Sequence, residues 1–356
     1  MDEKIERLTE WARRGKALPY SIELSPTLRC NLNCLFCWRY GKKINYGKEL
    51  TLEEYKRILK EAHQLKVREI RIIGGGEPLL RKDTFEIMKV VKNYGMFGYI
   101  CTNGTLFSNE IIKTLVAIGW DRVKISLHAP NKKNQDFLTQ RESFKKIIKN
   151  IRSFVNFKKK MKSDKPKIEI GFVLNKRNFR ETISMVKLTN KLKIQAFFVE
   201  PITVYTEMGE RLKLKKQEAK EFEKIAKNAY SIANNLETNL QQFFSTDLTE
   251  KTGKMTEEIK KLVKNKRKDF LSIPCYEPWW RIGIRNDGLV CPCGFLDQNT
   301  TENVREKGLE EIWFGKYFEM RRKQLLNKKL PKYCERCCTT LVLSNQLIRD
   351  ELSKLL

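Results

Sequence analysis

The chain has 356 residues, of which 41% are hydrophobic, so it can build one large domain or one large and one small domain. It contains no run of about 18 apolar residues, which excludes a membrane-spanning helix. The first residues, MDEKIERLTEWARR, are charged and lack the apolar segment of a secretion signal, so we expect a cytoplasmic protein.

The charge balance is strongly positive. There are 71 Lys and Arg residues against 43 Asp and Glu residues, which gives a formal net charge of +28. Such an excess favours a polyanionic partner, such as RNA or an anionic membrane surface. A solvated, lysine-rich surface accounts for the same count, so the charge leaves both interpretations open.

The ten cysteines are grouped along the chain. Three of them, Cys30, Cys34 and Cys37, follow the spacing C-x3-C-x2-C, whereas Cys101 stands alone. Grouped cysteines in a reducing compartment indicate metal sites rather than disulfides. The first group can close three thiolates around one iron–sulfur cluster and leave one iron open to a ligand. The remaining six cysteines are at positions 275, 291, 293, 334, 337 and 338.

The first 200 residues alternate between strand and helix patterns. Residues 2–15 predict an amphipathic helix, and residues 20–27 predict a strand that leads into the cysteine loop. Six strand–helix units predict an α/β fold, a partial (β/α)6 TIM-like barrel whose site lies at the C-terminal strand ends. We expect strands at 69–73, 98–101, 122–127, 168–174 and 194–199, and helices at 51–65, 83–94, 109–118, 141–158 and 180–192.

The last third of the chain has a different residue pattern from the first 200 residues. Alternating residues on either side of Asn286-Asp287-Gly288 predict a hairpin, and a helix is expected over 308–326, before the closing cysteines. This predicts a small C-terminal cysteine-rich hairpin-plus-helix domain. We therefore divide the chain into an N-terminal helix (1–19), a core barrel (20–205), a helical linker (206–270) and this C-terminal domain (271–356).

Two sets of motifs carry a family resemblance. The C-x3-C-x2-C spacing with Phe36 before its last cysteine, followed by Gly-Gly-Glu-Pro at 75–78, resembles the radical S-adenosylmethionine (radical SAM) superfamily. Cys275, the run N-D-G-x-V-x-P-C at 286–293, Glu311-Ile312-Trp313 and the closing C-x2-C resemble the twitch or SPASM auxiliary-cluster domain.

The resemblance implies a chemistry and its cofactors. Cys30, Cys34 and Cys37 would hold a [4Fe–4S] cluster with an open iron, to which SAM binds through its amine and carboxylate. One electron then cleaves SAM to a 5′-deoxyadenosyl radical, which abstracts hydrogen from a substrate. An external electron donor of the ferredoxin or flavodoxin type is implied, as is one auxiliary [4Fe–4S] cluster in the C-terminal domain.

The resemblance also implies site residues. Glu77 and the glycine edge before it would contact the SAM ammonium, and Phe36 would shield the adenine and the cluster. His128 and Glu200 are candidate catalytic residues at the strand ends, and Cys101 is either a thiol donor or a small buried side chain. The positions expected to bind the cofactor are Phe36, Gly74, Gly75, Gly76, Glu77, Asn103, Ser126 and Asn175.

The auxiliary cluster needs four ligands, and the C-terminal cysteines offer more. We expect Cys293 rather than Cys291, because Cys293 aligns with the last residue of V-x-P-C, although strand alternation does not separate the two. Cys338 is the spare thiol. Four cysteines also suit zinc, so the metal stays open at this point. The expected ligands are Cys275, Cys293, Cys334 and Cys337.

Similar enzymes act on several substrates, and peptide or protein maturation is our first prediction. RNA modification is the second enzymatic alternative, because the C-L-F-C-W-R run resembles the cluster loop of the wybutosine-forming tRNA enzyme, and residues 141–167 hold eleven Lys or Arg against two acids. An anionic lipid is a third possible substrate. The non-enzymatic alternative is an iron–sulfur or zinc protein that binds nucleic acid.

Overall fold

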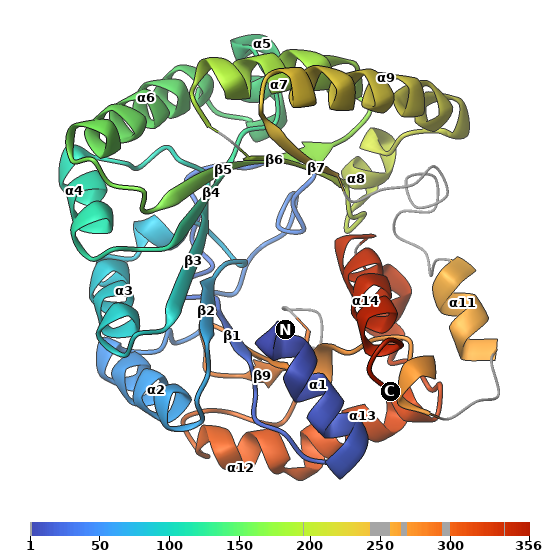
Figure 1. Cartoon of the computed structure of the whole chain (residues 1–356). Coiled ribbons are helices and arrows are strands. Elements are labelled where there is room, and N and C mark those ends of the chain that lie inside the picture. Colours follow the sequence, from blue (N-terminus) through green and yellow to red (C-terminus); the bar gives the residue numbers. More distant parts are fainter. Residues whose placement is uncertain (1, 195, 243–256, 265–268, 294–299, 338) are drawn as a thin grey trace.

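The computed structural model describes residues 2–194, 196–242, 257–264, 269–293, 300–337 and 339–356. Its centre is one curved sheet with helices around the outside, open on one side (Figure 1). Neighbouring strands follow the order β7-β6-β5-β4-β3-β2-β1-β8-β9, and every pair is parallel except β8 with β9. The predicted α/β class and the unclosed TIM-like barrel are therefore confirmed.

The strands begin close to where the sequence pattern predicts them. Their bounds are β1 Ser21–Leu24, β2 Glu69–Ile72, β3 Phe97–Thr102, β4 Arg122–Ser126, β5 Lys167–Leu174, β6 Ala196–Pro201, β7 Asn239–Gln242, β8 Arg281–Ile284 and β9 Val290–Cys291.

The described helices are α1 Glu3–Arg14, α2 Leu52–Gln64, α3 Thr84–Asn93, α4 Asn109–Ala117, α5 Lys132–Thr139, α6 Phe144–Lys160, α7 Thr182–Lys191, α8 Glu207–Leu212, α9 Lys216–Asn235, α11 Glu257–Lys264, α12 Leu309–Phe314, α13 Lys316–Leu326 and α14 Thr339–Leu352. Helices α2 to α7 and α9 lie along the outside of the sheet, and α14 lies at the open side of the barrel (Figure 1). No described helix is long and apolar enough to cross a membrane.

The structure differs from the sequence prediction at three places. The segment 206–270, predicted as helical, also holds β7, which extends the parallel sheet beyond β6. The first strand of the predicted C-terminal hairpin, β8, pairs with β1 and so joins the barrel sheet. The helix predicted over 308–326 is interrupted at Gly315, where an added Cβ would lie 2.4 Å from the Glu311 carbonyl oxygen.

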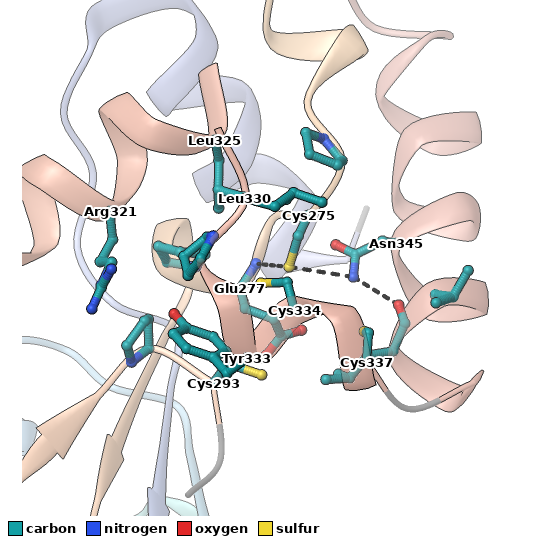
Figure 2. Close-up of a pocket in the computed structure, with 16 residues that line it drawn as sticks. Cys275, Glu277, Cys293, Arg321, Leu325, Leu330, Tyr333, Cys334, Cys337 and Asn345 are labelled. Carbon is teal, nitrogen blue, oxygen red and sulfur yellow. Dashed lines mark hydrogen bonds between the residues drawn. The ribbon is translucent and has the colours of Figure 1, made fainter. Parts of the chain in front are cut away.

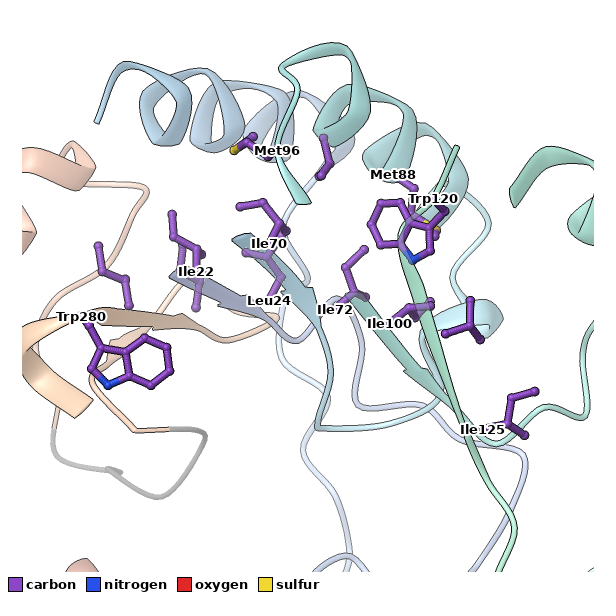
Figure 3. Close-up of a cluster of buried hydrophobic side chains, with 14 of the residues drawn as sticks. Ile22, Leu24, Ile70, Ile72, Met88, Met96, Ile100, Trp120, Ile125 and Trp280 are labelled. Carbon is purple, nitrogen blue, oxygen red and sulfur yellow. The ribbon is translucent and has the colours of Figure 1, made fainter. Parts of the chain in front are cut away.

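The hydrophobic core lies between the sheet and the helices. Alternate strand residues such as Ile22, Ile70 and Ile100 face outward and are fully buried in the layer that also contains Met88 and Trp120 (Figure 3). Because strand side chains alternate between the two faces, the residues between them point into the barrel. The apolar outer face therefore stabilises the fold and leaves the inner face free for polar side chains.

The inner face of the barrel carries paired charges. Arg281 of β8 forms an ion pair with Glu23 of β1 at 3.0 Å, and Lys124 of β4 pairs with Glu200 of β6. Buried charges are tolerated when they are paired in this way. The lower layers of the barrel are thus filled by ion pairs, whereas the upper end, at the C-terminal strand ends, forms a pocket.

Candidate active site and auxiliary metal centre

The first cysteine group follows β1 directly. Cys30, Cys34 and Cys37 are partly exposed and line one cavity of about 380 Å³ at the C-terminal ends of the strands. A turn closes between the last two, because the Cys37 amide donates to the Cys34 carbonyl oxygen at 3.0 Å. The loop is also held from outside, since the amides of Asn33 and Leu35 donate to carbonyl oxygens at the end of α5.

The environment of these three thiols suits a bound cation. Burial raises the pKa of Cys34 well above its ordinary value, and the neighbouring Cys37 and Cys30 raise it further. Burial also raises the pKa of Cys37, although the nearby Arg39 and Lys42 act in the opposite direction. Neighbouring, partly exposed thiols whose pKa values are raised become thiolates when a metal compensates their charge. The loop therefore fits an iron–sulfur cluster.

The glycine-rich edge after β2 packs against the cysteine loop. Gly74 and Gly75 adopt φ values of 75° and 65°, which favour glycine. An added Cβ at Gly76 would lie 2.0 Å from the Arg29 carbonyl oxygen, because the two backbones are in close contact. All three glycines line the cavity. They provide a side of the pocket made of backbone, and they also hold the loop that carries Cys30.

Glu77 is buried and organises this side of the pocket. Its carboxylate accepts hydrogen bonds from the Thr102 hydroxyl at 2.6 Å, the Asn103 amide at 2.7 Å and the Leu79 amide at 3.1 Å. Burial raises the pKa of Glu77, and these hydrogen bonds act to lower it. The described contacts therefore tie the glycine edge to the end of β3, and the carboxylate also lines the cavity.

Asn103 links the end of β3 to the first cysteine. Its Nδ2 donates to the Asn31 side chain at 2.8 Å and lies 4.0 Å from the Cys30 Sγ. Side-chain amides beside ligating sulfurs orient them and adjust the reduction potential of a cluster. Asn103 thus contacts the cysteine loop and also lines the cavity.

The far wall of the cavity is formed by β3, β4 and β6. Cys101 and Ser126 are neighbours there, with their Sγ and Oγ atoms 3.9 Å apart. Glu200, at the end of β6, also lines the cavity and pairs with Lys124. The residues predicted on three different strands are therefore brought to one wall.

His128 lies behind the cysteine loop and lines the same cavity. Its ring meets that of Phe36 edge-on, with 4.7 Å between the ring centroids, and its Nδ1 accepts from the Val173 amide at 3.1 Å. Burial, with a contribution from Lys124, lowers the pKa of His128 to about 3. The imidazole is thus neutral at ordinary pH and carries its proton on Nε2.

One predicted cofactor-binding residue has other contacts. Asn175 is fully buried but does not line the cavity; its Nδ2 donates to the Val173 carbonyl oxygen at 2.9 Å, and its Oδ1 accepts from the Arg177 amide at 3.0 Å. The side chain stabilises the turn after β5. Several cavity residues were not predicted, although those after β6 occupy a C-terminal strand end, where parallel sheets place their sites. They include Thr139, Thr203 and Tyr205.

The second cysteine group surrounds another pocket, at the base of α14 (Figure 2). Asn345 of α14 holds Cys275 in place, because its Nδ2 lies 3.7 Å from the Cys275 Sγ and its Oδ1 accepts from the Tyr276 amide at 2.6 Å. The Glu277 amide also donates to the Cys275 Sγ, at 3.5 Å. The four expected ligands all line this pocket: Cys275, Cys293, Cys334 and Cys337.

The structure distinguishes Cys291 from Cys293, two candidate ligands that strand alternation could not tell apart. Cys291 ends β9 and is fully buried in the core, whereas Cys293 lines the pocket. Pro292 stands between them and cannot donate to the strand ladder, so the chain leaves the sheet before Cys293. This geometry favours Cys293 as the ligand. Cys338, the predicted spare thiol, lies outside the described residues.

Zinc and an iron–sulfur cluster require different arrangements of their cysteine ligands. Among the described residues, no three Cys, His, Asp or Glu side chains converge on a point where a single ion could be held. Tetrahedral zinc needs all its sulfurs at about 2.3 Å from one centre. A cluster suits thiols set further apart, because each thiolate binds its own iron. Three cysteines line the first pocket and four line the second, and both are ligand sets that iron–sulfur clusters use.

Comparison with known proteins agrees with both sites. The model of the radical SAM superfamily matches residues 24–165, and that of the SPASM domain, an iron–sulfur cluster-binding domain, matches residues 275–338. Together the two matched ranges span more than half of the chain. The cofactors of these domains are SAM and [4Fe–4S] clusters.

Similar whole proteins cover the chain to different extents. An AdoMet-dependent heme synthase of Methanosarcina barkeri is 27% identical over 303 residues, which cover 83% of this chain and 82% of that protein. A probable GTP 3′,8-cyclase of Thermococcus kodakarensis is 33% identical over 137 residues, which cover 38% of this chain and 44% of that protein. This chain therefore matches less than half of that second relative.

A solved structure shares the fold over nearly the full chain. Streptococcus suis SuiB bound to its precursor peptide SuiA superposes with a TM-score of 0.68 at 18% identity, over 95% of this chain and 74% of that chain. The two family matches, the fold and the two cysteine pockets agree with one another. The chain belongs to the radical SAM superfamily and carries a C-terminal SPASM iron–sulfur domain.

Proposed function

We propose that this protein is an oxidoreductase of the maturase type, which uses SAM to abstract a hydrogen atom from a peptide or protein substrate. One observation carries the proposal. The cysteine loop and the glycine edge form one side of a cavity, and the opposite side holds polar side chains from three strand ends, among them Ser126 and Glu200. A cofactor bound on the first side would face a substrate on the second.

In this function, Cys30, Cys34 and Cys37 would hold the cluster, and the glycine edge with Asn103 would contact SAM. When bound, these groups supply one-electron bond cleavage and a carbon-centred radical. The neutral His128 ring and Phe36 close the back of the cavity and keep water away from it, which protects a radical from side reactions.

The second pocket would hold one auxiliary cluster that accepts one electron from the substrate radical, and loss of that electron with a proton would leave the substrate oxidised. Four cysteines line it, so every iron of a [4Fe–4S] cluster would have a protein ligand. A fully ligated cluster suits electron transfer rather than substrate binding. We further propose a reducing, cytoplasmic location, because the ligating cysteines must remain thiolates.

The substrate class rests on the similar proteins. A peptide is the first candidate, because SuiB, which shares the fold over 95% of this chain, was solved with a precursor peptide bound. A tetrapyrrole is the second candidate, because the heme synthase matches 83% of this chain. RNA and anionic lipid follow, since the +28 charge favours both and only RNA has further support, from the C-L-F-C-W-R run.

The reaction class can be tested without knowing the substrate. After anaerobic reconstitution, the protein with SAM and dithionite should release 5′-deoxyadenosine, and Cys34→Ala should release none. Cys291→Ala is the matched control, because Cys291 is buried and lines neither pocket, and it should retain release. Release that survives in Cys34→Ala, or its absence from the intact protein, would contradict the proposal and favour a non-enzymatic iron–sulfur protein.

The substrate class can be tested in parallel incubations. Radical SAM turnover is measured as 5′-deoxyadenosine released above the substrate-free rate, with mass loss in the substrate as the second readout. Peptides encoded beside the gene, iron-coproporphyrin III, tRNA and anionic vesicles are the four probes. Stimulation by peptide alone is expected, and stimulation by iron-coproporphyrin III alone would move the protein to the second candidate.

A further inference from the structure

The segment that carries the first cysteines has an unusual charge pattern. Between Ser25 and Lys48 the chain has no Asp or Glu. The same segment contains five cationic residues, which are Arg29, Arg39, Lys42, Lys43 and Lys48. A loop that holds a negatively charged cluster therefore presents only positive side chains of its own.

These cations are available at the surface. Lys42, Lys43 and Lys48 are exposed, and among the described residues neither Lys42 nor Lys43 takes part in an ion pair. The nearest acid in the sequence, Glu49, is shared by two guanidinium groups, at 3.1 Å from Arg29 and 3.6 Å from Arg81. The acid that neighbours this loop across the hairpin turn, Asp287, pairs with Arg285 at 2.9 Å. The surface of this segment therefore keeps a positive charge, because the two neighbouring acids are paired with arginines.

The surface also contains an exposed aromatic ring. Tyr46 is 46% exposed, although its carbonyl oxygen accepts from the Asn286 Nδ2 at 2.6 Å. The Leu50 amide donates to the Asn286 carbonyl oxygen at 2.7 Å, which fixes the same loop a second time. The ring and the lysines therefore stand on a segment anchored to the C-terminal hairpin. We call Lys42, Lys43, Tyr46 and Lys48 the loop surface.

The loop surface lies close to the first cysteine group. The Tyr40 amide donates to the Cys37 carbonyl oxygen at 3.0 Å, and the Lys42 amide donates to the Arg39 carbonyl oxygen at 3.1 Å. Two successive turns thus bring Lys42 back beside Cys37, within electrostatic reach of its sulfur. A molecule seated at this end of the loop surface would therefore lie beside the segment that carries Cys37.

We propose that the loop surface is the docking site of an acidic electron-carrier protein that reduces the cluster held by Cys30, Cys34 and Cys37. The inference rests on the proposed function, because only that function needs an electron at this loop. Charge complementarity directs the encounter, and an exposed aromatic ring among charges suits a small, transient interface. Electron transfer weakens steeply with distance, so the site beside Cys37 is the useful one.

The experiment compares two reductants on one pair of variants. The probe is a purified ferredoxin of negative net charge, reduced enzymatically, and dithionite is the small-molecule reductant. Lys43→Glu with Lys48→Glu should slow ferredoxin-driven release of 5′-deoxyadenosine about tenfold at low salt and leave the dithionite-driven rate unchanged. The matched control reverses two exposed lysines on α7, Lys187→Glu with Lys191→Glu, and should change neither rate.

A binding measurement separates this proposal from the reaction itself. The affinity of oxidised ferredoxin for the protein, followed by fluorescence anisotropy, should fall about tenfold in the Lys43/Lys48 variant and weaken steeply with salt. Equal losses in the α7 control would overturn the proposal, because they would indicate a general charge effect. So would unchanged ferredoxin affinity, or a loss confined to tRNA binding. Absence of 5′-deoxyadenosine from the dithionite reaction would count against the proposed function alone.

Discussion

The two cysteine pockets of this protein are built in opposite ways. The first uses three cysteines within eight consecutive residues, on a loop at the open end of the barrel. The second draws Cys275, Cys293 and Cys334 from segments far apart in the sequence, and its walls include proline and leucine side chains (Figure 2). The first pocket is built on one local loop and has several polar side chains in its lining, whereas the second is more apolar and is assembled by the tertiary fold. This difference suits the proposed roles, in which the first pocket admits cofactor and substrate and the second passes electrons.

The strongest test of this comparison removes one ligand from each pocket. Cys34→Ala and Cys275→Ala should each lower the iron content from about eight to about four per chain. Cys34→Ala should abolish 5′-deoxyadenosine release, whereas Cys275→Ala should retain release and lose substrate oxidation. Iron analysis with product chromatography measures both. Loss of release in both variants would mean that the two pockets do not have separate roles.

The next effect concerns the glycine edge, which only the first pocket has. Gly76→Ala would press a Cβ against the Arg29 carbonyl oxygen and displace the cysteine loop, so unfolding should become easier by about 2–3 kcal/mol. Thermal unfolding and SAM affinity measure the two consequences. Gly209→Ala is the control, because its added Cβ would have no neighbour closer than 3.6 Å. Equal behaviour of the two variants would refute the close contact.

A smaller effect is expected at the second pocket, where a side chain positions a ligand. Asn345→Leu removes the acceptor of the buried Tyr276 amide and the donor beside Cys275, at a cost of about 1–2 kcal/mol in unfolding free energy. The auxiliary cluster should also be lost faster to a chelator. Gln346→Leu, on the exposed side of the same helix, should change neither quantity. A cluster as durable as in the parent protein would exclude the positioning role.

The smallest effect is a pH dependence that comes from the back of the first pocket. Unfolded histidine binds a proton below about pH 6.5, but burial lowers the pKa of His128 to about 3 in the native protein. Stability is therefore lost as pH falls from about 6.5, by about 1 kcal/mol over the first unit. Urea unfolding at pH 7.0 and 5.5 measures the slope. His128→Asn should reduce the slope, whereas replacement of the exposed His63 by Gln should not reproduce that reduction.

Local features were predictable from the sequence. The capping box of α2 is present, with Thr51 and Glu54 exchanging hydrogen bonds, because four consecutive residues contain all its partners. The cysteine spacing likewise predicted a single loop, and all three sulfurs line one cavity. The strand–helix alternation predicted the parallel sheet, since each unit is determined by a short period of hydrophobic residues.

Features that depend on distant contacts were not predictable. Nothing around Arg281 indicates that β8 pairs with β1, which lies about 260 residues away. The choice between Cys291 and Cys293 depended on where β9 leaves the sheet. The Gly76 side of the pocket was expected to serve a ligand, but its tightest neighbour is the backbone of the cysteine loop. Asn175 occupied the expected strand end, and its side chain is engaged by its own turn.

Strand β1, which leads to the first cysteine pocket, lies in the sheet beside the strand that leads to the second. It pairs with β2 on one side and with β8 on the other, so Ser21 lies in register with both Glu69 and Arg281. The cysteine loop continues from β1, and the hairpin that leads to Cys293 continues from β8. The segments that lead to the two cysteine pockets therefore continue from adjacent, hydrogen-bonded strands of one sheet. In the proposed function, this shared sheet would hold the two clusters at a set distance on either side of the substrate.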